Sequence, residues 1–401
     1  MISAKPPLFW CWPSLLLGLV LVFSADGVRA VESEKPTNQI SKVTATKPLA
    51  AVLSPAKWQQ VEKSVDRGLA WIASQQAADG SFPTLPQGQP AVTSLCVMAF
   101  LSRGHQPGLG PYGQRINRAI DFVISCQMSN GLITFQPPGS VHQDQGASHT
   151  AVYNHAISGL MLGEVYGQVS GQRAKAAKQA IERALQFSRQ LQLRPKPTSD
   201  KGGWRYLRRL VLTGVDSDLS VTGWHLMFMR SAKNAEFDVP QACVDDAAAY
   251  VRRCWDEQTG MFNYALSGSG GFGAKRAMTG AGILSLSMGG QHQTPMALAA
   301  GDWLLKHPYR RFGELTSARD RFFYGAYYCS QAMAQLGGRY WEQFFPPLAD
   351  ALVSGQAPDG SWPPEIYQGG PTEAIFGNVY TTALAVLSLT PPYQLLPVYQ
   401  R

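Results

Sequence analysis

Charged residues are scarce in this chain of 401 residues. Asp, Glu, Lys and Arg make up 15% of the sequence, whereas 45% of it is hydrophobic. An open helical solenoid exposes two faces to water and needs more charge than this. No segment alternates apolar and polar residues with the period of a strand. The composition therefore favours a closed all-α body, in which one layer of helices is hidden from water.

Cysteine is also sparse, and its spacing excludes several kinds of site. The six cysteines include no Cys-x-x-Cys pair, which excludes a zinc ribbon and a thioredoxin-like centre. Cys243 and Cys254 lie on one predicted helix about 16 Å apart, too far for a disulfide. Five cysteines follow the N-terminal segment: Cys96, Cys126, Cys243, Cys254 and Cys329. We expect them to pack as small buried hydrophobes, and their disulfide status stays open.

The histidines form no metal-binding pattern. His149 and His155 are six residues apart, on nearly opposite faces of one predicted helix, so they cannot share an ion. His142 lies in a predicted loop and His225 on a helix one repeat away. We therefore expect no metal and no cofactor, and histidines that are hydrogen-bonded within a packed wall.

What the chain does contain is a recurring unit: an amphipathic helix, a Gly-rich turn with an aromatic residue, and an apolar helix. The clearest turns are QQAADGSF (Gln75 to Phe82) and GQAPDGSW (Gly355 to Trp362). Weaker relatives are CQMSNGLI from Cys126, DKGGWRY from Asp200 and DEQTGMFNY from Asp256. Such units must close on one another to bury their apolar helices.

The helical periods predict six pairs of helices. The amphipathic outer members are expected at 58–75, 113–126, 173–191, 239–254, 293–306 and 340–354. The inner members, rich in Ala, Gly, Ser, Leu and Met, are expected at 90–103, 147–165, 218–232, 275–288, 320–336 and 375–389. The predicted fold is an (α/α)6 toroid over residues 58–401.

The first 30 residues have the features of a signal peptide. Lys5 supplies the positive charge, Leu8 to Phe23 the apolar stretch, and Val28-Arg29-Ala30 the cleavage site. The apolar stretch contains Pro13 and is shorter than the ~20 residues of a membrane span, so cleavage is favoured over anchoring. Residues 31–57 read as a flexible linker. We expect export to the periplasm, the envelope or the medium.

Basic residues crowd the third repeat and account for part of the net charge of +8. They are Arg189, Arg194, Lys196, Lys201, Arg205, Arg208 and Arg209. A solvated loop is the preferred interpretation, and peripheral contact with an anionic membrane or polymer is the alternative. No nucleic-acid motif is present, so we expect no nucleic-acid partner.

The DGSF and DGSW turns resemble the QW repeats of the terpenoid cyclase and protein prenyltransferase superfamily. In that superfamily a Gln and an aromatic residue tie repeats together, and the toroid encloses an apolar cavity for an isoprenoid. The residues that correspond here are Gln76, Phe82, Trp204, Gln356 and Trp362. Other stretches, such as GGWRYL and the terminal PPYQLLPVY, are similar to exported bacterial squalene-cyclase-repeat proteins. The resemblance implies the fold more strongly than a reaction.

The resemblance implies a catalytic acid, but the chain departs from the pattern. Class II cyclases protonate an alkene with the middle Asp of a DxDD motif. Asp218 matches that acid and Asp216 the first position, whereas Leu219 replaces the last Asp. The alternative is that Asp218 caps the inner helix that begins at Leu219. The zinc site of the prenyltransferases is not expected, because Gly325 stands where those enzymes have a His.

The predicted ligand-cavity residues are polar and aromatic residues near the starts of inner helices, since these ends gather on one side of a toroid, and aromatic residues of the cavity wall. They are His149, Tyr153, Trp224, Arg276, Thr279, Tyr324, Tyr328 and Tyr380. Core packing is the alternative for each. A glycosidase pair of carboxylates, Asp218 with Asp320 or Glu373, is a further alternative. The last is a scaffold that binds a lipid, or a protein at its rim, without chemistry.

Overall fold

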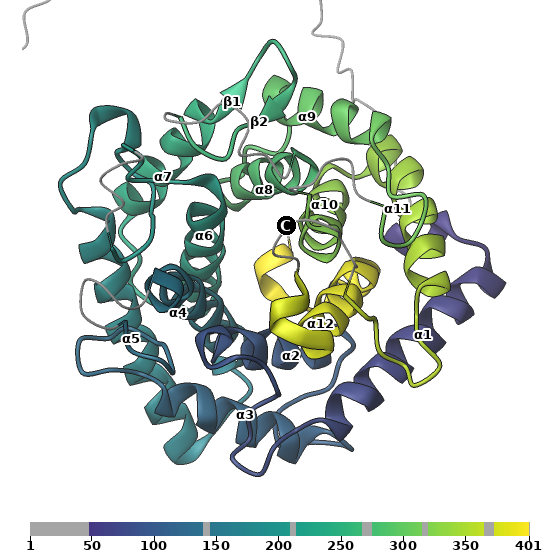
Figure 1. Ribbon diagram of the computed structural model, residues 1–401, viewed down its shortest axis with the longest axis horizontal. Coiled ribbons are helices and arrows are strands. Elements are labelled where there is room, and N and C mark those ends of the chain that lie inside the picture. Colours follow the sequence, from purple (N-terminus) through teal and green to yellow (C-terminus); the bar gives the residue numbers. More distant parts are fainter. Residues whose placement is uncertain are drawn as a thin grey trace, which may run out of the picture. The chain divides into compact units, whose positions relative to one another are not determined.

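In the computed structural model, twelve α-helices of the described residues form an inner and an outer ring (Figure 1). The described residues are 48–138, 145–208, 214–266, 275–314, 320–364 and 373–400, and they belong to the unit Thr46–Arg401. The signal peptide predicted for residues 1–30 and the predicted linker as far as residue 47 lie outside them.

The helices alternate between the two rings along the chain. The outer helices are α1 (Pro55–Ser74), α3 (Gly113–Ser125), α5 (Gly171–Gln192), α7 (Gln241–Arg253), α9 (Pro295–Lys306) and α11 (Gly338–Ser354). The inner helices are α2 (Ala91–Ser102), α4 (Gln145–Tyr166), α6 (Leu219–Asn234), α8 (Lys275–Met288), α10 (Phe322–Leu336) and α12 (Gly377–Leu389). The 3-10 helices are η1 (Leu49–Val52), η2 (Pro86–Gly88), η3 (Thr198–Asp200), η5 (Glu373–Phe376), η6 (Pro391–Tyr393) and η7 (Pro397–Tyr399).

Contacts between neighbours run all the way round. Each inner helix packs on the next, and α12 packs on α2; in the outer ring α11 packs on α1. The outer helices bury one stripe, as α5 does with Ala177, Ala180, Ile181 and Ala184, whereas every residue of α2 is buried. The predicted all-α toroid is therefore confirmed.

One glutamine contact recurs at the end of four outer helices. Gln76 donates from Nε2 to the carbonyl oxygens of Gly80 (2.9 Å) and of Arg115 on the next outer helix (2.8 Å). Gln127, Gln192 and Gln356 each make the same two kinds of bond. One of the two bonds of Gln356 goes to the carbonyl oxygen of Ser64 on α1 and so joins the end of the last outer helix to the first.

The residue that follows each of these turns is fixed to an inner helix. The backbone N–H groups of Phe82, Trp204 and Trp362 donate to the hydroxyls of Thr93, Thr222 and Thr382 at 3.0–3.1 Å. At the second turn His155 takes the place of the Thr: its Nδ1 accepts from the N–H of Ile133 at 3.2 Å. His155 is thus a wall residue, as expected.

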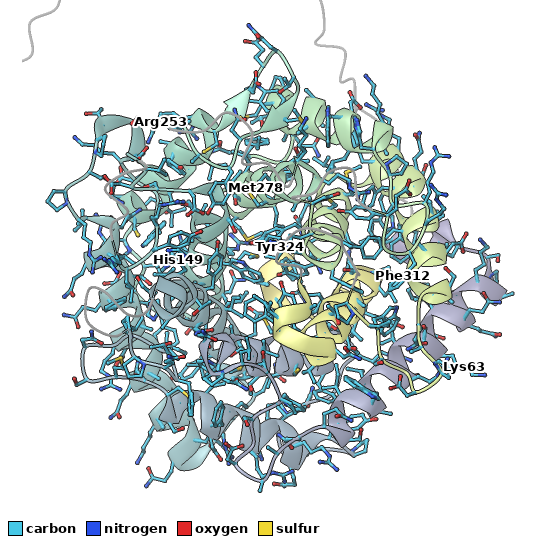
Figure 2. The ribbon with its side chains drawn as sticks, in the orientation of Figure 1. Lys63, His149, Arg253, Met278, Phe312 and Tyr324 are labelled. Atoms are coloured by element: carbon cyan, nitrogen blue, oxygen red, sulfur yellow. The ribbon has the colours of Figure 1, made fainter. Side chains whose placement is uncertain are left out.

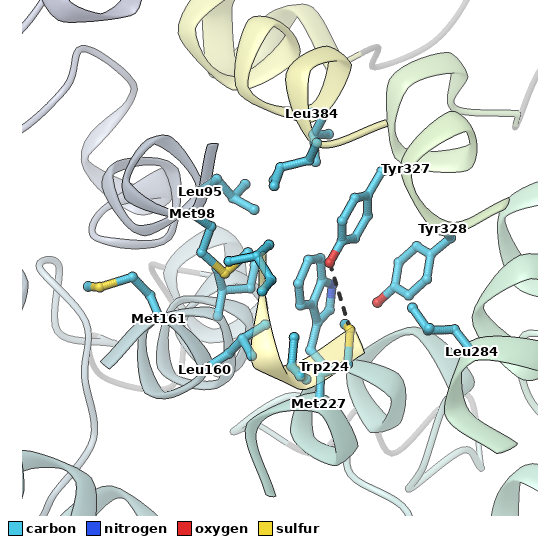
Figure 3. Close-up of a cluster of buried hydrophobic side chains, with 14 of the residues drawn as sticks. Leu95, Met98, Leu160, Met161, Trp224, Met227, Leu284, Tyr327, Tyr328 and Leu384 are labelled. Atoms are coloured by element: carbon cyan, nitrogen blue, oxygen red, sulfur yellow. Dashed lines mark hydrogen bonds between the residues drawn. The ribbon is translucent and has the colours of Figure 1, made fainter. Parts of the chain in front are cut away.

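The centre of the inner ring is filled by side chains (Figure 3). All six inner helices contribute buried residues to it: Leu95, Met98, Leu160, Met161, Trp224, Met227, Leu284, Tyr327, Tyr328 and Leu384. Trp224 stacks on Tyr327 with 5.4 Å between ring centroids. A guest molecule would therefore have to lie at one end of the ring and not along its whole axis.

Two predictions about local structure were wrong. Strands β1 (Trp255–Asp256) and β2 (Met261–Phe262) pair antiparallel, although no strand was expected; a two-residue strand is too short to show a period. Residues 49–57, assigned to the linker, belong to the ring instead. Ser54 caps α1 at Pro55, and the carbonyl oxygen of Leu49 accepts from Trp341 Nε1 at 2.8 Å.

The five described cysteines are buried, as expected, and none of them forms a disulfide, which the sequence had left open. Among the described helices, none combines the length and the apolar character that crossing a membrane requires.

Candidate functional site at the rim of the ring

Asp218 lies at the start of α6 and is fully buried. Its Oδ1 accepts from the backbone N–H of Val221 at 2.8 Å, which makes it the N-cap of the helix. Its Oδ2 accepts from Arg205 Nη1 at 2.7 Å. Burial raises the pKa of the Asp218 carboxyl above its ordinary 3.8, and the Arg205 charge and the Val221 N–H oppose that rise.

Asp216 is half-buried and contributes to the site through its backbone. The N–H groups of Asp216 and Ser217 donate to Oδ2 of Asp200, at 2.5 and 3.2 Å, and the Ser217 hydroxyl donates to the Asp200 carbonyl. Asp200, which is buried and was not singled out in the sequence, therefore fixes the loop that leads to Asp218.

Arg205 joins the loop after the third turn to the start of α6. Its guanidinium lies 4.4 Å from the ring centroid of Tyr206 and 5.5 Å from that of Tyr264, and its side chain is 12% exposed. The hydroxyls of Tyr206 and Tyr264 are 2.7 Å apart. This loop folds back on α4, where the N–H of Arg208 donates to the Ser148 hydroxyl.

A line of hydroxyl groups connects three inner helices beside this pair. Tyr153 of α4 donates to the Ser220 hydroxyl of α6 at 2.9 Å, and the Ser220 and Tyr324 hydroxyls are 2.7 Å apart. Trp224 Nε1 donates to the Tyr324 oxygen at 3.1 Å. Tyr324 projects from the start of α10 towards the middle of the ring (Figure 2). Burial raises the pKa of Tyr324 to about 12, so this hydroxyl stays protonated.

His149, near the start of α4, lies beside the same group of tyrosines. Its imidazole stacks on Tyr206, with 4.1 Å between ring centroids. Burial, helped by the charge of Arg205, lowers the pKa of His149 below its ordinary 6.5, so the ring is neutral at pH 7. We call the set His149, Tyr153, Arg205, Tyr206, Ser220, Tyr264 and Tyr324 the rim.

The other predicted cavity residues divide by burial. Tyr380 is half-buried and packs on Phe376 at 5.3 Å, whereas Trp224, Tyr328 and Thr279 are buried and have almost no surface left for a ligand. Arg276 is buried in a second ion pair, which Asp320 completes at 2.6 Å. Its guanidinium lies 3.8 Å from the centre of the Tyr309 ring.

Gly325, the position at which the prenyltransferases have a His, is crowded by Tyr309. A side chain at Gly325 would collide with the Tyr309 hydroxyl. Within the described ranges, no three His, Cys, Asp or Glu side chains gather as metal ligands would. For the glycosidase alternative, Asp218 and Asp320 each face their own arginine, and the side chain of Glu373 lies outside the described residues.

The basic cluster of the third repeat largely braces its own loop. Arg194 donates to the Leu207 carbonyl at 2.9 Å, and Lys196 donates to that of Gly203 at 2.6 Å. The role of Arg205 was not predicted, because its sequence neighbours are other basic residues that favour a solvated loop. Arg205 follows Trp204, which pairs with Asp218 in an isolated antiparallel β-bridge. Arg205 therefore comes close to Asp218 only in the folded loop.

No protein-family model matches the sequence, and no curated protein matches it. Solved structures do. The type II terpene cyclase MstE from Scytonema, in complex with its substrate geranylgeranyl dihydroxybenzoate, matches with TM-score 0.53 and 16% identity over 86% of this chain and all of that chain. A protein from Actinoplanes matches with TM-score 0.54 and 17% identity over 83% of this chain and 99% of that one.

Sugar-cleaving enzymes share the architecture as well. The GH76 alpha-mannanase of Bacteroides thetaiotaomicron matches with TM-score 0.55 and 11% identity, over 83% of this chain and 96% of that one. At such identities the likeness establishes a fold and not a reaction. The chain therefore has the helical toroid fold that the terpene cyclase MstE also has.

Proposed function

We propose that the ring binds an apolar, isoprenoid-like small molecule, with the polar end of the ligand at the rim, in a protein that acts after export. The observation that carries the proposal is the position of Tyr153 and Tyr324. Both keep part of their surface exposed, although their hydroxyls are joined through Ser220 between inner helices. They offer polar contacts beside a centre packed mainly with apolar and aromatic side chains, which suits a ligand with one polar end.

The fold neighbour supports the class of ligand. MstE holds geranylgeranyl dihydroxybenzoate, a prenyl chain that carries a polar aromatic group. In this chain the apolar part would contact aromatic faces near Tyr324, and the polar part would reach the hydroxyls and Arg205. Hydrogen bonds from such groups orient a ligand, while contact with apolar surface supplies most of its affinity.

Class II proton transfer from Asp218 is the second candidate, and the burial that raises its pKa favours it. Against it stands the pairing of both carboxylate oxygens, one with a helix N–H and one with Arg205. A cation within hydrogen-bond distance stabilises the carboxylate and so opposes uptake of the proton that Asp218 would have to hold before it could protonate an alkene. The geometry therefore favours binding over cyclisation.

A protein partner at this end is the remaining alternative. Three exposed apolar side chains, Leu85, Phe135 and Ile375, lie on loops that precede or contact the inner helices. Those loops are joined to one another by bonds from Thr84 to Phe376 and from Phe135 to Gln89. A partner that uses them would lose affinity in a Leu85→Ser/Ile375→Ser variant, whereas binding of a prenyl ligand would be unchanged.

Calorimetry with geranylgeranyl dihydroxybenzoate and with geranylgeraniol tests the proposal. We expect saturable binding, and a Kd about five- to tenfold higher in Tyr324→Phe, the loss of one ligand hydrogen bond. Tyr166→Phe at the far end of α4 is the control and should bind as the wild type does. Asp218→Asn should bind the ligands as tightly as the wild type, and neither protein should convert them to a product. Absence of binding to both probes would refute the proposal, and a wild-type product that Asp218→Asn abolishes would establish cyclisation instead.

A further inference from the structure

The C-terminal segment Thr390–Gln400 crosses the end of the ring opposite the rim. After α12 ends at Leu389, the chain turns inward, and the C-terminus lies near the centre of the ring (Figure 1). On its way it meets the last turns of several inner helices. Arg103 at the end of α2 covers the ring of Tyr393 at 4.8 Å, and Leu395 approaches Gly104.

Side chains from three further inner helices hold the backbone of this segment. Glu164 of α4 accepts the N–H of Val398 at 3.2 Å. Asn234 of α6 donates to the Pro397 carbonyl at 3.0 Å, and Gln335 of α10 donates to that of Tyr399 at 2.5 Å. The segment is thus bound as a peptide ligand is, through side chains of its receptor and without a ladder of backbone bonds.

The segment also fills apolar space. Leu396 and Val398 are 4% and 1% exposed. The Tyr399 hydroxyl meets the hydroxyl of Tyr327 and lies 3.6 Å from the sulfur of Met227, both of which belong to the packed centre. The C-terminus therefore occupies the position that an apolar chain entering from this end would take.

Among the three described side chains that hold the backbone of the segment, Glu164 is the acidic one. Its Oε1 accepts from the Ser231 hydroxyl at 2.5 Å, and it is 4% exposed. Burial raises the pKa of Glu164 from its usual 4.5 to about 7, although the bonds from Ser231 and Val398 oppose the rise. The titratable groups that face it are Tyr327 of α10 and Tyr399 of the segment, whose pKa values burial raises, so both stay neutral.

We propose that the C-terminal segment is a releasable plug of the ring, with Glu164 as its latch, and that its release opens a second binding site for an apolar chain beside Met227 and Tyr327. When the segment leaves, water reaches the Glu164 carboxyl and its pKa falls towards the usual 4.5. The docked state therefore holds more protons than the released state, and docking weakens as pH rises through the range in which the docked carboxyl ionises. The proposal does not require the rim to bind anything.

Trimming by carboxypeptidase tests the latch on the full chain. The rate at which the last residues are lost is followed by intact mass and divided by the rate for a free peptide of residues 390–401 in the same tube. Between pH 6 and pH 8 the normalised rate for the wild type should rise about tenfold, because Glu164 ionises over that range. Glu164→Gln, which cannot ionise, should show no rise, and the exposed Glu182→Gln should behave as the wild type.

Two further measurements complete the test. Ser231→Ala removes a donor that lowers the pKa of Glu164, so the midpoint of release should move to higher pH. The fluorescence of 1-anilinonaphthalene-8-sulfonate should increase together with release, and a chain that ends at Tyr393 should bind the dye at every pH. A rise in trimming that persists in Glu164→Gln, a midpoint that Ser231→Ala leaves unchanged, or release without dye binding would overturn the proposal.

Discussion

Two acids stand at the starts of the inner-ring helices α6 and α10, and each is paired with an arginine, yet their surroundings differ. Asp218 caps α6, and its partner Arg205 comes from a loop and stays 12% exposed beside the part-exposed Tyr206 and Tyr264. Asp320 precedes α10, and its partner Arg276 is wholly buried under Tyr309, with further bonds to the carbonyls of Pro308 and Glu314. The first pair borders a surface on which a ligand can act, whereas the second holds the ring together.

The largest loss of stability is expected on substitution of Arg276, in the wholly buried pair. Arg276→Met should lower the free energy of unfolding by about 3–5 kcal/mol, because it leaves Asp320 buried without its cation. Urea unfolding followed by circular dichroism measures the change. The exposed Arg310→Met is the control, and we expect it to lie within about 0.5 kcal/mol of the wild type. If both variants were equally stable, the second pair would have no structural role.

A smaller loss is expected at Arg205. Arg205→Met should cost about 2 kcal/mol at pH 8, since Asp218 keeps its bond from the Val221 N–H and the site is partly wet. Without Arg205 the pKa of Asp218 rises further, so Asp218 becomes protonated on acidification and needs no cation. The loss should therefore shrink between pH 8 and pH 5. A cost that exceeds that of Arg276→Met, or one that grows on acidification, would reverse the distinction between the pairs.

The smallest loss of stability is expected at Gly325, which packs tightly against Tyr309 beside the second pair. Gly325→Ala should cost about 1 kcal/mol, because the new methyl group meets only the flexible end of Tyr309, its hydroxyl. Gly325→Ala/Tyr309→Phe should recover part of that loss, and thermal melting of the two variants and of Tyr309→Phe measures the coupling. Additive effects in this double-mutant cycle would show that the two residues are not in contact.

The sequence predicted the helices well and the rim only in part. Alternating amphipathic and apolar helices are local patterns, so the predicted ranges agree with the twelve helices to within about three residues at most ends. The partner of Asp218 could not be predicted, because Arg205 reaches it only after residues 205–208 fold onto Ser148 of α4. That contact joins residues distant in the chain and leaves no periodic signal.

Spacing explains the other omissions. Gln76 and Gln356 lie four residues before their turn glycines, and so does Gln127. Gln192 bonds to Gly202, ten residues later, because a longer loop separates the helix from the turn. A fixed spacing therefore misses Gln192, whereas Gln127 has the spacing and was still not among the predicted residues. The C-terminal segment carries Pro and Leu but no period, and so its position across the ring was not predicted.

The bond between Gln356 and Ser64 has a consequence for how the molecule is made. During synthesis α1 emerges first, yet its outer-ring neighbour α11 is translated some 280 residues later, as the separation of 292 positions between Ser64 and Gln356 implies. Until α11 has been translated, the apolar side of α1 that faces it has no packing partner. The first helix of the ring can therefore complete its contacts only after one of the last has been made. Contacts of such long range delay completion of a fold, so a ribosome-bound nascent chain should remain an open arc.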